Sequence, residues 1–116
     1  MMLENKEAIA TGSARGTGKA VALQFARKGA VVVVNDVDLE KAEEVGHQIK
    51  SQGGQALVVR ADVSNQKEVE EMVKSIYSKF GKIDILVNNA GIIKRGSIED
   101  HSYDEWNKII DVNLTY

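Results

Sequence analysis

Residues 11–18, Thr-Gly-Ser-Ala-Arg-Gly-Thr-Gly, are the part of the sequence whose types and spacing suggest chemistry most directly. An apolar run precedes them and a helix-forming run follows. A strand, a glycine-rich turn and a helix in this order present unpaired backbone N–H groups to a phosphate. Gly12 can adopt a positive φ, Gly16 lets a ligand approach the backbone, and Gly18 lets the helix pack closely on the strand. The segment predicts a phosphate-containing ligand.

A second kind of phosphate loop must be compared with this one. Gly18 and Lys19 suggest the pattern G-x-x-x-x-G-K-[ST] of nucleotide-hydrolysing proteins. That pattern requires a glycine where Ser13 stands and a hydroxyl where Ala20 stands. Because the hydroxyl is a ligand of Mg²⁺, its absence argues against a phosphate-hydrolysing site.

Asp36 bears on which nucleotide would bind. It closes the second predicted strand, about 20 residues after the loop, where a carboxylate can accept hydrogen bonds from both hydroxyls of a ribose. A 2′-phosphate at that place would meet a like charge. Arg15 argues the other way, because a guanidinium could pair with a 2′-phosphate. We give Asp36 more weight, since repulsion excludes a ligand whereas a solvated arginine only tolerates one, and we expect NAD in preference to NADP.

Short apolar runs alternate along the chain with longer amphipathic runs. We expect strands at 6–11, 30–34, 56–59 and 83–87, and helices at 16–28, 38–50, 65–80 and 102–116. This alternation predicts right-handed βαβ units and a parallel sheet. The expected fold is α/β, a Rossmann-like doubly wound parallel sheet of strand order 3-2-1-4. A ligand crevice is expected beside strands one and four, where the order reverses.

Composition bounds the class of protein. The 116 residues suit a single domain, 1–116, and carry a net charge of −2 with both signs interspersed, so no basic patch predicts a nucleic-acid partner. The absence of cysteine excludes thiolate metal sites, and His47 and His101 lie far apart, so no metal is expected. No run approaches the ~20 apolar residues of a membrane span. A cytoplasmic location is expected by default.

Four motifs together resemble the short-chain dehydrogenase/reductase family: the glycine-rich loop, Asp62-Val63, the run 88–91 (Asn-Asn-Ala-Gly), and Asn113 within Asp-Val-Asn-Leu. They occur in the family's order and spacing over essentially the whole chain. The resemblance implies that the pyrophosphate and adenosine ribose are surrounded by Gly12, Arg15, Gly16, Thr17 and Gly18. It implies that Asp36 binds the ribose hydroxyls and that Asp62 and Val63 lie at the adenine. Asn89, Ala90 and Gly91 would support the central strand and pass beside the cofactor.

The resemblance also implies a reaction, the transfer of hydride between a nicotinamide and a small alcohol or carbonyl substrate. Asn113 resembles the family's active-site asparagine, which holds a water in the proton relay; an amide can orient water without titrating. The family's serine and Tyr-x-x-x-Lys pair have no counterpart here, since Tyr77 and Tyr103 lack a lysine four residues later. We therefore expect a truncated domain, the cofactor-binding half of a dehydrogenase, inactive alone.

Two other functions remain open on these residues. One is a dinucleotide-binding module without catalysis. The other is a methyltransferase-type domain, against which the run 88–91 and Asp62-Val63 argue. Residues 83–87 would form an exposed apolar edge if nothing paired with them, so self-association is expected, and the resemblance implies a homo-oligomer.

Overall fold

The computed structural model describes residues 2–88 and 110–113. Strands and helices alternate from β1 to β4, and a further strand follows. The elements are β1 (Glu7–Ala10), α1 (Gly16–Arg27), β2 (Val31–Asp36), α2 (Leu39–Ser51), β3 (Gln55–Arg60), α3 (Gln66–Phe80), β4 (Ile85–Asn88) and β5 (Ile110–Asn113). All strand pairs are parallel, in the order β3-β2-β1-β4-β5. The predicted order 3-2-1-4 of a Rossmann-like sheet is confirmed.

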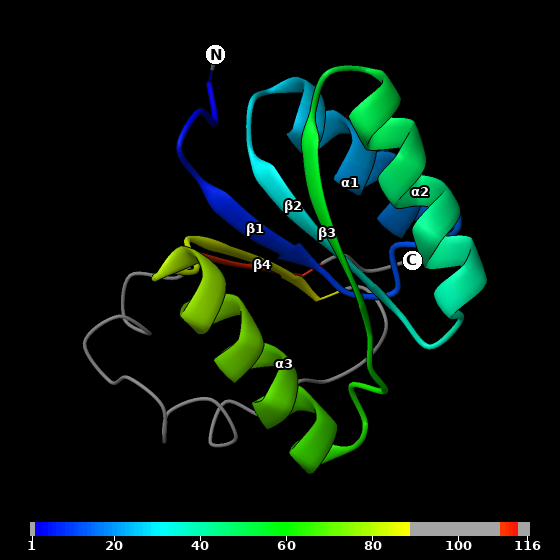
Figure 1. Ribbon diagram of the computed structural model, residues 1–116, viewed down its shortest axis with the longest axis vertical. Coiled ribbons are helices and arrows are strands. Elements are labelled where there is room, and N and C mark those ends of the chain that lie inside the picture. The colour runs from blue at the N-terminus through cyan, green and yellow to red at the C-terminus, as the bar shows by residue number, and fades with distance from the viewer. Residues whose placement is uncertain (1, 89–109, 114–116) are drawn as a thin grey trace.

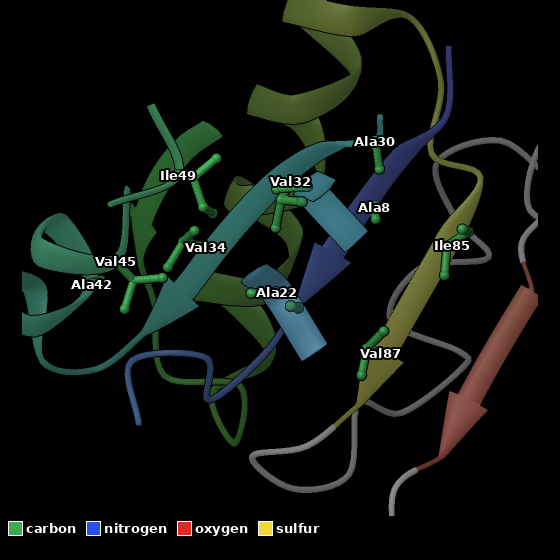
Figure 2. Packing of buried hydrophobic residues seen from close by; sticks show 12 residues of the cluster. Ala8, Ala22, Ala30, Val32, Val34, Ala42, Val45, Ile49, Ile85 and Val87 are labelled. Atoms are coloured by element: carbon green, nitrogen blue, oxygen red, sulfur yellow. The ribbon is translucent and has the colours of Figure 1, made fainter. Parts of the chain in front are cut away.

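Helices cover both faces of the sheet (Figure 1). The core between the sheet and the helices α1 and α2 contains many small side chains: Ala8 and Ala10 from β1, Ala22 and Ala26 from α1, and Ala42 from α2. Figure 2 shows Ala8, Ala22 and Ala42 from this cluster together with Val32, Val34 and Ile49. The core on the opposite face contains larger side chains: Ile9 and Leu86 from the sheet, and Met72 and Ile76 from α3. Successive residues of each strand point to opposite faces, which explains why the strands are almost continuously apolar.

Residues 110–113 correct the expectation of a helix at 102–116. They form β5, which pairs in parallel with β4, placing Ile110 beside Ile85 and Asn113 beside Asn88. These residues, Ile-Asp-Val-Asn, alternate apolar and polar side chains as a strand does, but four residues are too few for their period alone to separate a strand from a helix. The remaining residues of that predicted helix lie outside the described part of the chain. Because β5 covers β4, the predicted exposed edge at strand four is also wrong.

Local sequence signals explain where α1 ends and where α3 begins. α1 stops at Arg27, and Gly29 follows with φ 99°, as expected of a glycine after a helix. Asn65 caps α3 by accepting a hydrogen bond from the backbone N–H of Glu68 at 3.1 Å. The reciprocal half of a capping box does not form: the backbone N–H of Asn65 donates to the carbonyl oxygen of Asp62 at 3.0 Å, and the Glu68 carboxylate pairs with Arg60 at 2.8 Å.

Close packing of α2 on β3 leads to a first prediction, at Gly46. A Cβ added there would lie 2.6 Å from Cγ2 of Val58, far inside van der Waals contact. Overpacking of this kind costs about 1–3 kcal/mol, against a gain of about 1 kcal/mol in helix propensity. Gly46→Ala is expected to lower the melting temperature. The double variant Gly46→Ala, Val58→Ala should be more stable than Val58→Ala alone, because it keeps the helix gain without the overlap; an equal loss in both backgrounds would contradict this origin.

Candidate functional site

The glycine-rich loop begins where β1 is tied to β4. Thr11 is fully buried, and its backbone N–H donates to the carbonyl oxygen of Val87 at 3.0 Å. Its hydroxyl donates to the same oxygen at 3.2 Å. These bonds extend the pairing of β1 with β4 beyond the last strand residue and fix the point from which the chain turns.

The next residues tie the loop to β2. Ser13 is fully buried; its backbone N–H and its hydroxyl both donate to the carbonyl oxygen of Asn35, at 3.0 and 3.2 Å. The backbone N–H of Asn35 in turn donates to Ser13 Oγ at 3.1 Å. Sequence reasoning missed these contacts, since Ser13 counted only as a departure from the hydrolase pattern. A small polar residue three positions after the end of a buried strand was the available signal.

Beyond Ser13 the loop opens to solvent at the start of α1. Gly12 and Gly16 have φ of 58° and 59°, in the left-handed region where glycine is favoured. Residues 15–17 are exposed, and a Cβ at Gly16 would meet nothing within 4 Å. Arg15 occupies the N-cap without a side-chain hydrogen bond, and the first turn holds no acidic residue. A helix start without a side-chain cap, and without an acidic residue in its first turn, attracts an anion.

Asp36 lies at the end of β2, beside this loop. Its side chain is 7% exposed. Oδ2 accepts a hydrogen bond from the backbone N–H of Ala14 at 3.1 Å, and Oδ1 accepts one from the backbone N–H of Asp38 at 3.1 Å. Each carboxylate oxygen keeps a further lone pair for another donor. Asp36, the residue predicted to bind the ribose, is thus hydrogen-bonded directly to the loop predicted to bind the phosphates.

Asp62 and Val63 follow β3 on the far side of β2. The side-chain hydroxyl of Ser64 donates to Asp62 Oδ1 at 2.6 Å and the Ser64 backbone N–H at 2.9 Å, and these bonds lower the pKa of the Asp62 carboxyl. Asp62 is therefore an ionised acceptor at neutral pH. Val63 is buried in the cluster against α3. The segment is held to β2 through Ala61, whose carbonyl oxygen accepts from Asn35 Nδ2 at 3.2 Å.

The structure brings together most of the residues that the sequence singled out. Asp36 is bonded through Ala14 to the loop that holds Gly12, Arg15, Gly16, Thr17 and Gly18. Asn35 is bonded through Ala61 to the segment of Asp62 and Val63. Asn113 lies at the end of β5 beside Asn88, so its expected place on a helix is wrong. Asn89, Ala90 and Gly91 lie outside the described residues.

Other features of the described residues do not add to this site. A hollow of about 380 Å³ lies at the amino ends of the strands, whereas the loop lies at their carboxyl ends. Glu7, Val31 and Gln55 are among the residues that line the hollow. Within residues 2–88 and 110–113, no three potential metal ligands gather as a cation site would need. None of the helices described there has the length and apolarity to cross a membrane.

A nicotinamide dinucleotide fits these residues. Its pyrophosphate is an anion suited to the open, uncapped start of α1, and its ribose offers hydroxyl donors to Asp36. Gly16 leaves the space that a close approach to the backbone requires. The donor and acceptor types on both sides of β2 thus match a dinucleotide.

Comparison with known proteins gives the same result. The family model for short chain dehydrogenase matches residues 6–115. The chain is 44% identical over 114 residues to the (2S)-[(R)-hydroxy(phenyl)methyl]succinyl-CoA dehydrogenase subunit of Thauera aromatica, covering 98% of this chain and 46% of that protein. This chain therefore spans less than half the length of that relative.

Solved structures resemble it as well. One is a 7α-hydroxysteroid dehydrogenase complexed with NADH and 7-oxo glycochenodeoxycholic acid, with a TM-score of 0.75 and 44% identity over 78% of this chain and 35% of that one. Another is a metagenomic short-chain oxidoreductase in complex with NADP, with a TM-score of 0.76 and 34% identity over 79% of this chain and 42% of that one. The chain belongs to the short-chain dehydrogenase family.

Proposed function

We propose that the protein is a nicotinamide-dinucleotide-dependent oxidoreductase that transfers hydride between the cofactor and a small alcohol or carbonyl substrate. Residues 1–116 act in it as the dinucleotide-binding domain. The observation that carries the proposal is the direct bond between Asp36 and the backbone of the glycine-rich loop, which brings a ribose acceptor and a pyrophosphate site to one place. Membership of the dehydrogenase family supports the activity.

NAD is the proposed cofactor, in preference to NADP. A 2′-phosphate would lie against the Asp36 carboxylate, which is buried at the end of β2 and cannot turn freely away because two backbone N–H groups hold it. Arg15 is exposed at the N-cap, where water competes for its charge. Since the similar structures include one with NADH and one with NADP, the choice depends on these two residues of this chain.

Each residue then has a defined part in binding. Arg15, Gly16, Thr17 and Gly18 surround the pyrophosphate, and Gly12 shapes the turn. Asp36 accepts from the ribose hydroxyls, Asp62 and Val63 contact the adenine, and the run 89–91 passes beside the cofactor. The bound nicotinamide supplies the hydride or receives it. Asn113 orients a water for proton exchange with the substrate oxygen, since an amide donates and accepts without titrating.

Calorimetric titration of NAD and NADP, followed by a hydride-transfer assay with a panel of alcohols, tests the proposal. We expect NAD to bind at least about tenfold more tightly than NADP, the ratio that corresponds to 1.4 kcal/mol of repulsion at the ribose. Failure to bind either dinucleotide would refute the site. Binding without turnover is expected of residues 1–116 under this proposal and under a dinucleotide-binding module without catalysis alike, since these residues lack the Tyr-x-x-x-Lys pair; turnover by them alone would contradict the expectation that they are inactive alone. A cytoplasmic location and a homo-oligomeric state stay predictions, the second testable by sedimentation.

A further inference from the structure

Ser13 and Asn35 lie between the two halves of the proposed dinucleotide site, the glycine-rich loop and the segment of Asp62 and Val63. Both are buried and polar, and neither is expected to contact the cofactor. Their side chains are 0% and 1% exposed. A buried polar side chain costs free energy unless it makes hydrogen bonds, so its partners indicate what it does. Here the partners lie on both sides of β2, in the glycine-rich loop and in the segment that follows β3.

Ser13 substitutes for the pairing that β1 no longer supplies. The regular register of β1 with β2 ends at Ala10 beside Val34. One residue further along β2, the backbone N–H of Asn35 donates to Ser13 Oγ at 3.1 Å, and its carbonyl oxygen accepts from the Ser13 backbone and hydroxyl. The side chain of Ser13 thus does what a strand carbonyl would do, while the chain itself is free to turn into the loop.

Asn35 continues the connection on the other side. Its Nδ2 donates to the carbonyl oxygens of Val59 at 3.1 Å and Ala61 at 3.2 Å. Two carbonyl acceptors fix the orientation of the carboxamide, because its own oxygen would be repelled there. The second bond reaches past the end of β3, which stops at Arg60, and holds the chain immediately before Asp62.

We infer that Ser13 and Asn35 are positioning residues for the dinucleotide, a buried pair that holds the pyrophosphate loop and the adenine-side segment in one fixed relation. This inference rests on the proposed function. It goes beyond it because neither side chain is assigned a contact with cofactor or substrate. Their effect is to preorganise two separate contact regions, so that binding need not order them.

The pair is tested with Ser13→Ala, the milder change, and with Ser51→Ala as its matched control. Ser51 also donates its hydroxyl to a backbone carbonyl, that of Gln48 at 2.8 Å, but it is exposed at the end of α2. We expect Ser13→Ala to weaken NAD about tenfold in calorimetric titration, as loss of one buried hydrogen-bond partner predicts, and Ser51→Ala to leave the affinity unchanged. Equal NAD affinities of the folded Ser13→Ala variant and the unaltered chain would overturn the inference.

In the variant Asn35→Asp, the melting temperature and the NAD affinity should depend on pH in a way that general destabilisation would not produce. The introduced carboxyl faces the carbonyl oxygens of Val59 and Ala61, so its protonated form, which can donate to one of them, is favoured and its pKa is raised. Its contribution to stability is present at low pH and lost as pH rises through the raised pKa. We expect the melting temperature and the NAD affinity of this variant to fall with rising pH relative to the unaltered chain. Parallel pH profiles would overturn the inference.

The two variants together show whether the residues act as a unit. If they do, Ser13→Ala combined with Asn35→Asp loses no more NAD affinity than Asn35→Asp alone, whereas independent effects multiply; multiplied losses would overturn the inference. Failure of the proposed function gives a different result. In that case the unaltered chain binds neither dinucleotide, while the pH-dependent melting of Asn35→Asp still reports the contact with the two carbonyls.

Discussion

Replacement of Gly16 with glutamate is expected to abolish binding of both NAD and NADP while the chain remains folded. Gly16 has φ 59°, where an L side chain costs about 1–2 kcal/mol. The new carboxylate would stand at the uncapped start of α1 and satisfy the N–H groups that would otherwise meet the pyrophosphate. Occupation of these donors and repulsion of the anion together should reduce affinity more than about a hundredfold, or 2.7 kcal/mol.

The matched control for this change is Gly53→Glu. Gly53 also has a positive φ, 85°, and an added Cβ there would meet nothing within 4 Å. It follows α2 and lies before the start of β3, at the end of the strands away from the loop. Both variants should lose stability in thermal melting, and only Gly16→Glu should lose cofactor in calorimetric titration. Retained NAD affinity in Gly16→Glu would remove the start of α1 from the proposed site.

Asp36→Ala is expected to lower the affinity for NAD about a hundredfold and to destabilise the loop at the same time. Two ribose hydroxyls lose a charged acceptor, each such bond contributing about 1.5–3 kcal/mol. The backbone N–H of Ala14, a buried residue, also loses its acceptor, at a cost of about 1–3 kcal/mol in unfolding free energy. NADP should gain relative to NAD without binding more tightly in absolute terms, because the loop that holds its pyrophosphate is no longer fixed.

Asp38→Ala separates these two effects. Asp38 caps α2 by accepting a hydrogen bond from the backbone N–H of Lys41 at 3.1 Å, and its loss should cost about 1 kcal/mol. Its side chain makes no bond to the loop among the described contacts, so thermal melting should shift while both affinities stay constant. If NADP binds more tightly than NAD to the unaltered chain, the greater weight given to Asp36 over Arg15 is wrong.

The fold was predictable wherever its determinants are local. The apolar strands and the amphipathic helices between them are each set within a few residues, and their alternation predicted the sheet order 3-2-1-4 that the structure shows. β5 was not predictable, because a four-residue strand with an ambiguous period is decided by its partner β4, which lies more than 20 residues earlier in the chain.

Some features of the candidate site were also predictable from the sequence, and others were not. The spacing of Asp36 from the loop identified it as a ribose ligand candidate, since that distance follows from one βα unit and the next strand. Its bond to Ala14, and the bonds between Ser13 and Asn35, join residues 22 positions apart through side chain and backbone. No periodicity or composition encodes such contacts, so they required the folded chain.

The central place of β1 also has a consequence for the order of events in folding. Thr11 donates to Val87, 76 residues later, whereas paired residues of β1 and β2, such as Ala8 and Val32, are 24 positions apart. Contacts between distant positions close a longer loop and form more slowly. During synthesis the pairing of β1 with β2 can therefore precede that with β4. The glycine-rich loop acquires its bonds to Val87 only after residue 87 has left the ribosome.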